Sequence, residues 1–360
     1  RNEVKRTLSK GLQQISQRYI ENISVEQLAL QGLRGLSSLD PTLQVNKTHD
    51  TVVIESHLIK RHTYTAPAVY DWSGWAKLIV DAISDSKKDS AIFSQAKMTL
   101  IYEAIFDGSL SSLDTFSRYA NEQEARKNRE KRSGFGGIGI RFKISQKGIV
   151  VNQVFSATPA SKIGIKSNDI ITHIDRISLT NIKHEDALAH LRGKIGSTID
   201  LRLLRPSKIS SKRSKFVPHS FLLKRDQIII PTTSYSLRND VLYIRITSFN
   251  DQTSKHLATN IKDVFNDASK NSREKAKGII IDLRDNPGGL LQQAVKVSNL
   301  FLVNGRIIAT KGRHPASTNN YEADGTDISG GLPLVILING RSASAAEIVA
   351  AALQDNDRAV

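Results

Sequence analysis

The strongest constraint on the fold comes from the second half of the chain, where short apolar runs alternate with amphipathic segments. The apolar runs cover 241–246, 278–283 and 332–338, and helical patterns cover 255–268, 290–302 and 346–354. Runs that are apolar at nearly every position predict strands buried on both faces, and intervening helices predict parallel strand–helix–strand connections. We therefore expect an α/β core whose reactive loops lie at the carboxyl ends of the strands.

The last of these strands leads through a turn of small residues, 339–343, into a helix that begins near Ser344. The N-terminus of a helix has unpaired N–H groups and a positive dipole, which would stabilise an oxyanion that develops beside the serine. Ser344 and Glu347 also have the spacing of a capping box, in which the serine only caps the helix. A nucleophile and a helix cap are both open here, and the cap is the commoner use of the pattern.

A second turn follows the strand at 278–283 and reads Asn286-Pro287-Gly288-Gly289. Its glycines let the backbone approach a ligand closely and could supply another N–H to an oxyanion, although an ordinary strand-to-helix turn has the same composition. A serine nucleophile also needs a base. No lysine follows Ser344, and Asp355 lies about 16 Å along the predicted helix, too far to touch the hydroxyl.

The first part of the chain has different patterns. Residues 1–130 have apolar side chains at spacings of three and four and are predicted to be helical, although the stretch around Trp72 and Trp75 is not assigned. From Gly134 a glycine-rich loop opens a β-rich unit that extends to residue 206. Residues 207–215 are rich in Ser and Lys, which indicates an exposed linker or a hairpin tip.

Composition excludes several classes of protein. The chain of 360 residues has no cysteine, which rules out disulfides, thiol nucleophiles and Cys-ligated metals, and we expect no cofactor or metal. Its apolar runs are far shorter than the roughly 20 residues that a membrane span needs. The net charge of +16 comes from dispersed residues, so no specific nucleic acid is expected. Because the chain starts at Arg1, we expect that a signal peptide or membrane anchor precedes it.

Four segments in a fixed order now point to one family. They read YIRITSFNDQT, GIIIDLRDNPGGLLQQAV, TKGR and INGRSASAAEIVAAALQDNDRAV, and a GFGGIGI unit precedes them. Together they resemble the carboxyl-terminal processing, or tail-specific, serine proteases over about residues 100–360. The resemblance implies three domains: a helical N-terminal region at 1–130, a PDZ domain at 131–207 and an α/β protease core at 208–360 that is incomplete at its C-terminal edge.

The resemblance also implies the site residues. The family's nucleophile is the middle serine of an S-A-S-A-S-E string, which falls on Ser344, while Ala346 replaces the string's last serine. The oxyanion donors would be the N–H groups of Ala345 and Gly288, and Asp355 matches an acidic position that some members use. The family works through a Ser–Lys dyad, and its lysine lies in a Gly-Lys-Gly segment beyond Val360. We therefore expect residues 1–360 alone to lack peptidase activity.

The PDZ resemblance predicts how substrates are selected. The N–H groups of Gly137, Ile138, Gly139 and Ile140 would hold a terminal carboxylate, and the strand after them would pair with the peptide. Ala187, Leu188 and Leu191, on a helix of the same unit, are candidates to line the pocket or simply to fill the core. The expected substrates are proteins with apolar C-terminal tails.

Partners and location complete the expectations. Some relatives dimerise through N-terminal helices, and we expect a homodimer of that kind, an adaptor protein and a periplasmic or extracytoplasmic location. Two other functions stay open: a non-catalytic PDZ scaffold derived from the protease fold, and a binder of anionic membrane surfaces through Lys208, Lys212, Arg213 and Lys215.

Overall fold

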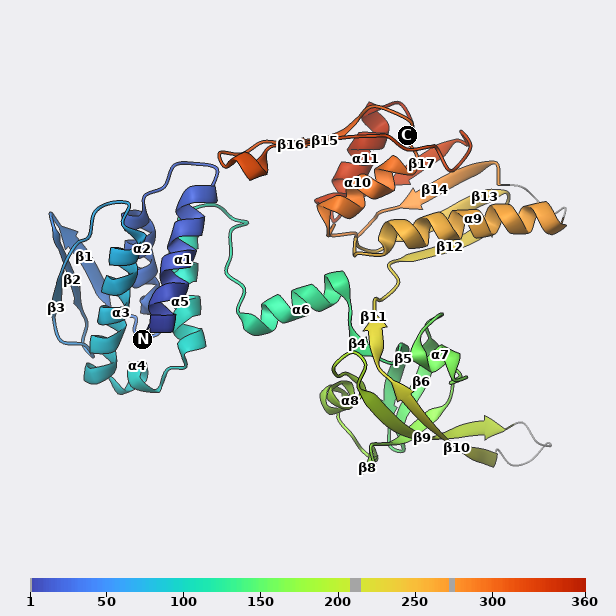
Figure 1. The fold of residues 1–360 in the computed structure, drawn as a ribbon, viewed down its shortest axis with the longest axis horizontal. Coiled ribbons are helices and arrows are strands. Elements are labelled where there is room, and N and C mark those ends of the chain that lie inside the picture. Colours follow the sequence, from blue (N-terminus) through green and yellow to red (C-terminus); the bar gives the residue numbers. More distant parts are fainter. Residues whose placement is uncertain (1, 208–214, 272–275) are drawn as a thin grey trace. The chain divides into compact units, whose positions relative to one another are not determined.

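The computed structural model describes residues 2–207, 215–271 and 276–360 (Figure 1). Contacts divide the chain into two compact units. The first contains Arg1–Arg126 and Ile308–Tyr321, and the second contains Lys127–Ile307 and Glu322–Val360. None of the described helices is both long enough and apolar enough to cross a bilayer.

The first unit packs helices around one apolar core and also carries an antiparallel sheet. Its helices are α1 (Asn2–Arg18), α2 (Val25–Gly35), η1 (Leu36–Ser38), α3 (Trp72–Asp89), α4 (Ala91–Gln95) and α5 (Met98–Ser111). The sheet has the order β1 (Gln44–Thr48), β2 (Thr51–Glu55) and β3 (His62–Thr65). Trp75 and Phe93 are fully buried.

That small sheet is absent from the sequence prediction, which assigned no strand to residues 1–130. Strand β2 contains the β-branched run Thr51-Val52-Val53-Ile54, in which Val52 and Ile54 are buried and their neighbours are half-exposed. Alternate burial of β-branched residues is the pattern of a strand with one solvated face. The stretch that the sequence left unassigned begins α3, where the Asp71 carboxylate caps the helix.

The segment Ile308–Tyr321 belongs to the first unit, although the residues before and after it belong to the second. It includes most of β15 (Arg306–Thr310) and of β16 (Asn319–Glu322), which pair with each other, and η2 (Pro315–Ser317) between them. The Arg313 guanidinium donates hydrogen bonds to the backbone oxygens of Ser16 and Tyr19. These oxygens lie at the C-terminal end of α1, where carbonyls lack helical partners and a cation is favourable.

The second unit begins within α6 (Glu122–Ser133), a helix with no buried residue, and continues into the β-rich segment. The elements that follow are β4 (Phe135–Gly137), β5 (Ile140–Ser145), β6 (Gly148–Val154), α7 (Pro159–Lys162), β7 (Ile170–Ile174), β8 (Ile177–Ser178), α8 (His184–Leu191), β9 (Thr198–Ser207), β10 (Lys215–Lys224) and β11 (Asp226–Ile228). The main sheet has the order β10-β9-β7-β6-β5, while β8 pairs with β7 and β4 pairs with β11. Strand β5 is therefore an edge strand.

The pairing of β9 with β10 corrects the predicted boundary at 207/208. Strand β10 pairs with β9 along its whole length, from Lys215 opposite Ser207 to Lys224 opposite Thr198. Residues 215–224 thus belong to the same sheet as the predicted PDZ domain and not to the predicted protease core. Sequence reasoning allowed a hairpin tip at 207–215 but placed the boundary there; Lys208, Lys212 and Arg213, with most of that tip, lie outside the described residues.

The remaining elements form the predicted α/β core. Its sheet has the order β12 (Thr233–Arg238), β13 (Val241–Ile246), β14 (Gly278–Asp282) and β17 (Leu334–Leu337). The last three strands are parallel, and β12 is antiparallel to β13. The helices are α9 (Thr253–Asn271), α10 (Leu291–Asn299) and α11 (Ala345–Asp355). Parallel strands with helical crossovers bring the loops after β14 and β17 to one edge of the sheet.

Candidate functional site

Ser344 has a strained backbone at the turn between β17 and α11. Its φ is 55° and its ψ is −116°, and the residue is exposed, whereas Ala345 and Ala346 behind it are fully buried. A non-glycine residue in such a region costs on the order of 1–3 kcal/mol and persists only where the surrounding structure holds it. A sharp, strained strand-to-helix turn that exposes a serine is the geometry of a nucleophile elbow.

The helix-cap interpretation of Ser344 is also confirmed. Glu347 accepts a hydrogen bond from the Ser344 N–H and completes a capping box. A capping residue ordinarily has an extended backbone, with negative φ. Capping therefore explains the pairing of Ser344 with Glu347 but does not account for the positive φ of the serine.

The Asn286–Gly289 loop, after β14, lies directly against this turn. Gly288 has a φ of 91°, and a Cβ added to it would lie 2.8 Å from the Ser344 Cβ and 2.8 Å from the Ala345 nitrogen. The Ala343 N–H donates to the Asn286 oxygen at 3.0 Å. Only glycine fits at position 288. The structure thus brings three of the four predicted catalytic positions close together, namely Ser344, Ala345 and Gly288.

The two predicted oxyanion donors differ in this conformation. Ala345 is the first residue of α11, so its N–H is one of the four at a helix start that have no intrahelical partner. The Gly288 N–H instead donates to the Asn286 Oδ1 at 2.8 Å. The role of Gly288 as a donor stays a prediction, because Asn286 would have to release its N–H.

Asn286 is a residue that sequence reasoning quoted without giving it a role. Its side chain is fully buried, and its Nδ2 donates to the Ile246 oxygen at the end of β13 at 2.9 Å. Through its side chain and backbone, Asn286 joins β13, the glycine loop and the Ser344 turn. The signal that could have found it is an amide residue placed directly before Pro-Gly-Gly at a strand end.

A buried carboxylate supports the same edge of the sheet. Asp282 ends β14 with no exposed side-chain area and accepts hydrogen bonds from Tyr243, from Arg245 at 2.9 Å and from the Arg284 Nε at 2.9 Å. The Arg284 guanidinium, followed by the Tyr243 hydroxyl, outweighs burial and holds the pKa of Asp282 well below its usual value. Asp282 is therefore ionised at neutral pH, and its charge is compensated.

A second carboxylate links the loops after β14 and β17. The Asp285 N–H donates to the Asn339 Oδ1 at 2.9 Å, and the Asn339 Nδ2 donates back to the Asp285 Oδ1 at 2.8 Å. Arg341 forms an ion pair with the same carboxylate at 2.6 Å. Asn339 and Arg341 together lower the pKa of Asp285, with the larger effect from Asn339. These contacts fix the glycine loop relative to the serine turn.

Asp355, the fourth predicted catalytic position, is not brought to Ser344. It is the last residue of α11, which runs unbroken for 11 residues, so Asp355 lies about 15 Å from the helix start. Its support of catalysis stays a prediction. Within the described residues no group of three or more His, Asp or Glu side chains could hold a metal ion.

The predicted peptide-binding strand is the free edge of its sheet. Among the residues that the structure describes, β5 pairs only with β6, which leaves its other edge available for an added strand. Gly139 has a φ of 86°, and a Cβ there would collide with Thr158, so the loop before β5 requires glycine. On the neighbouring helix, His184 stacks on Phe142 of β5 with ring centroids 5.2 Å apart, so α8 lies beside this edge.

The structure divides the side chains predicted to line this groove. Leu188 is half-buried on α8, as a pocket residue would be, and Ile140 at the start of β5 is half-buried as well. Ile138, Ala187 and Leu191 are at most 5% exposed and belong to the core of the sheet. For Ala187 and Leu191 the core alternative is confirmed. Because the Ile138 side chain is also in the core, the proposed ligand contact of Ile138 is limited to its backbone N–H.

Comparisons with known proteins agree with this geometry. The family described as "Peptidase family S41" matches residues 240–360, and the PDZ domain matches residues 136–213. A carboxy-terminal-processing protease of Bartonella bacilliformis is 36% identical over 260 residues, which is 72% of this chain and 58% of that protein. The carboxy-terminal processing protease CtpA of Bacillus subtilis is 32% identical over 259 residues, or 71% of this chain and 52% of that protein.

Among solved structures, the photosystem II D1 C-terminal processing protease aligns with 99% of this chain and 80% of its own, at 20% identity and a TM-score of 0.40. The chain spans a little over half the length of the two curated relatives described above. Two family matches in the expected order, an exposed strained serine and a free PDZ edge lead to one conclusion. The chain belongs to the carboxy-terminal processing proteases of peptidase family S41, with a PDZ domain before the protease segment.

Proposed function

We propose that the protein is a serine endopeptidase that selects substrates by their apolar C-terminal tails and cleaves them with Ser344. The observation that carries the proposal is the backbone of Ser344, which is strained and exposed at a helix start and lies against a glycine that no larger residue could replace. Strained residues cluster at active sites, because a strained strand-to-helix turn exposes the side chain of the nucleophile.

The proposed mechanism begins at the PDZ edge. The tail pairs with β5, its carboxylate accepts hydrogen bonds from the loop at 137–140, and its apolar side chain packs on Leu188. Ser344 then cleaves the bound substrate: the Ser344 Oγ attacks the scissile carbonyl of the substrate while a base takes the hydroxyl proton. The oxyanion accepts a hydrogen bond from the Ala345 N–H at the positive end of α11. Expulsion of the amine leaves an acyl-enzyme that water hydrolyses.

The proposed base is a neutral lysine, as in a Ser–Lys dyad. Residues 345–360 contain none. We therefore expect residues 1–360 alone to bind tails without cutting them. Binding without cleavage is also what the rival function, a non-catalytic PDZ scaffold, predicts. The Gly288 N–H favours this rival, because it already donates to Asn286 and is not available to an oxyanion. We further propose an extracytoplasmic location, on the resemblance to bacterial processing proteases, whereas homodimer, adaptor and membrane contacts stay predictions.

The deciding experiment uses the natural full-length protein rather than residues 1–360 alone. It compares this protein with its Ser344→Ala variant on an unstructured protein substrate that ends in an apolar tail. We expect kcat to fall at least about 1,000-fold, with the affinity for the tail unchanged, because only the nucleophile is lost. Ser234→Ala, at an exposed position of β12, is the matched control. Equal cleavage by the Ser344→Ala variant would refute the nucleophile, and no cleavage by the native protein under any condition would favour the scaffold.

A further inference from the structure

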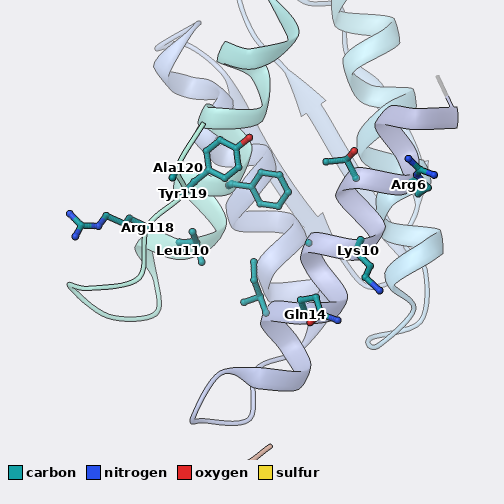
Figure 2. A pocket seen from close by; sticks show the side chains of 11 residues that line it. Arg6, Lys10, Gln14, Leu110, Arg118, Tyr119 and Ala120 are labelled. Carbon is teal, nitrogen blue, oxygen red and sulfur yellow. The ribbon is translucent and has the colours of Figure 1, made fainter. Parts of the chain in front are cut away.

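A surface pocket of about 840 Å³ lies within the first unit, between α1 and the segment that ends α5 and follows it (Figure 2). One wall comes from α1 and the other from residues 106–120. The lining residues are Arg6, Thr7, Lys10, Gly11, Gln14, Ile15, Phe106, Leu110, Arg118, Tyr119 and Ala120. The volume lies within the range of about 300–1,000 Å³ that is usual for small-molecule sites.

The floor of the pocket is apolar and firmly packed. Phe106 is 5% exposed and stacks on Tyr119, with ring centroids 5.0 Å apart and planes inclined by 15°. Gly11 lets α1 approach this stack, because a Cβ there would lie 2.4 Å from the Phe106 ring. Ile15 and Leu110 extend the apolar surface. This part of the pocket suits an aliphatic body.

The rim of the pocket carries three cations without counterions. Arg6 and Lys10 are one helical turn apart on α1, and Arg118 comes from the opposite wall (Figure 2). Within the described residues, no carboxylate forms an ion pair with any of the three. Like charges four residues apart on a helix repel each other, so an anion bound between Arg6 and Lys10 would be favourable.

Two carboxylates of α5 near Tyr119 do not supply that anion. Glu103 and Asp107, on α5, raise the pKa of Tyr119, although burial is the larger cause. Glu103 accepts a hydrogen bond from the Asn121 side chain. Neither carboxylate lines the pocket. An apolar floor, three uncompensated cations and a small-molecule volume together call for a ligand with one anionic head and one apolar chain.

We propose that this pocket binds a single-chain carboxylate amphiphile, of the fatty-acid class. The carboxylate lies between the cationic side chains of α1, and the hydrocarbon lies on Phe106, Ile15 and Leu110. The pocket shares no residue with the Ser344 turn or with the PDZ edge, so the proposal stands whether or not the protein is a peptidase.

The test uses residues 1–360 and the fluorescent probe 11-(dansylamino)undecanoic acid, with decanoate, laurate and 1-dodecanol as competitors below their aggregation concentrations. We expect saturable binding, displacement by laurate and little displacement by 1-dodecanol. Laurate should bind about 15-fold more tightly than decanoate, because each of its two extra methylenes contributes about fourfold.

Matched variants locate the site. Arg6→Gln/Lys10→Gln/Arg118→Gln should weaken laurate at least tenfold, whereas Lys127→Gln/Arg129→Gln/Lys131→Gln, with the same change of charge on exposed α6, should not. Ala120→Phe should weaken the probe by filling the pocket. Leu188→Arg should leave the probe bound, which excludes the PDZ groove. Circular dichroism shows whether each variant is folded.

Three outcomes would overturn the proposal: no saturable binding, equal displacement by laurate and 1-dodecanol, or equal weakening by the two charge variants. Displacement of the probe by an acidic amphipathic peptide, with no displacement by laurate, would also overturn it and would make the pocket a protein-docking groove.

Discussion

The edge of the PDZ sheet and the turn at Ser344 are both proposed to present backbone to a substrate, but they are built in opposite ways. Along β5 the backbone is available because the sheet ends there, and nothing has to hold it in an unusual conformation. At Ser344 the backbone is strained, and the buried Asn286 and Asp282, together with the exposed Asp285, fix the loops around it. The proposed peptide recognition therefore needs only an unpaired strand edge, whereas the proposed cleavage needs neighbouring side chains that hold a strained turn in place.

The comparison predicts that the turn at Ser344 is destabilised when the buried Asn286 side chain beside it is removed. Asn286→Ala leaves the Ile246 oxygen and the Gly288 N–H without their partners, so we expect a loss of about 2 kcal/mol in the free energy of unfolding of the second unit. Urea denaturation followed by far-UV circular dichroism measures this loss. Both tryptophans lie in the first unit, so the fluorescence transition should not move.

The control for this variant is Asn152→Ala, on the exposed face of β6, which should change stability by less than about 0.5 kcal/mol. If both variants have the same stability, Asn286 does not support the turn, and the contrast between the two regions is wrong.

A smaller effect concerns pH. The pKa of Asp282 in the folded state is lowered, so its contribution to stability is complete above the unfolded pKa of about 4 and is lost as the pH falls below it. We expect the stability of the native chain to exceed that of Asp282→Asn by a constant amount between pH 7 and 5, and the difference to shrink towards pH 3. Urea midpoints at each pH measure it. A difference that grows on acidification would contradict the assignment.

The smallest expected effect is at the PDZ edge, where the backbone does most of the binding. Leu188→Arg should weaken a fluorescein-labelled decapeptide that ends in valine about tenfold and should leave the urea midpoint almost unchanged, because Leu188 is only half-buried. Fluorescence anisotropy measures the affinity. Leu222→Asp is the control: it lies on β10, at the opposite edge of the sheet, and is 72% exposed.

An amidated version of the peptide separates the two parts of this interaction. It should bind weakly to every variant, since the loop at 137–140 is proposed to hold the carboxylate. Equal binding of the free and amidated peptides would remove the carboxylate from the recognition scheme, even if Leu188→Arg weakens both.

The protease core was the part of the fold easiest to predict from sequence. Parallel strands buried on both faces read as continuous apolar runs, and 241–246 coincides with β13. The sheet at β1–β3 was missed because helical spacing on both sides hid a short alternating run. The end of the PDZ sheet was missed because β10 lies beyond a polar tip that also resembles a linker.

The site was predictable where one residue type is chemically indispensable. The small-residue turn and the glycine pair at two strand ends marked the place, and the family resemblance assigned Ser344, Ala345 and Gly288 within it. The supporting groups were not predictable, because their contacts join distant positions: Asp285 meets Asn339 across 54 residues, and Tyr243 meets Asp282 across 39. The strain at Ser344 also leaves no trace in composition.

The return of the chain to the first unit through Ile308–Tyr321 affects how the protein can be dissected. Removing residues 1–126 would deprive Arg313 of the α1 carbonyls to which it donates. Isolating residues 1–126 would leave those carbonyls without the Arg313 guanidinium. The N-terminal region is therefore a discontinuous module, and cutting the gene at one boundary separates it from part of itself. A protease nick near Arg313 would loosen it while leaving both halves of the polypeptide full of native structure.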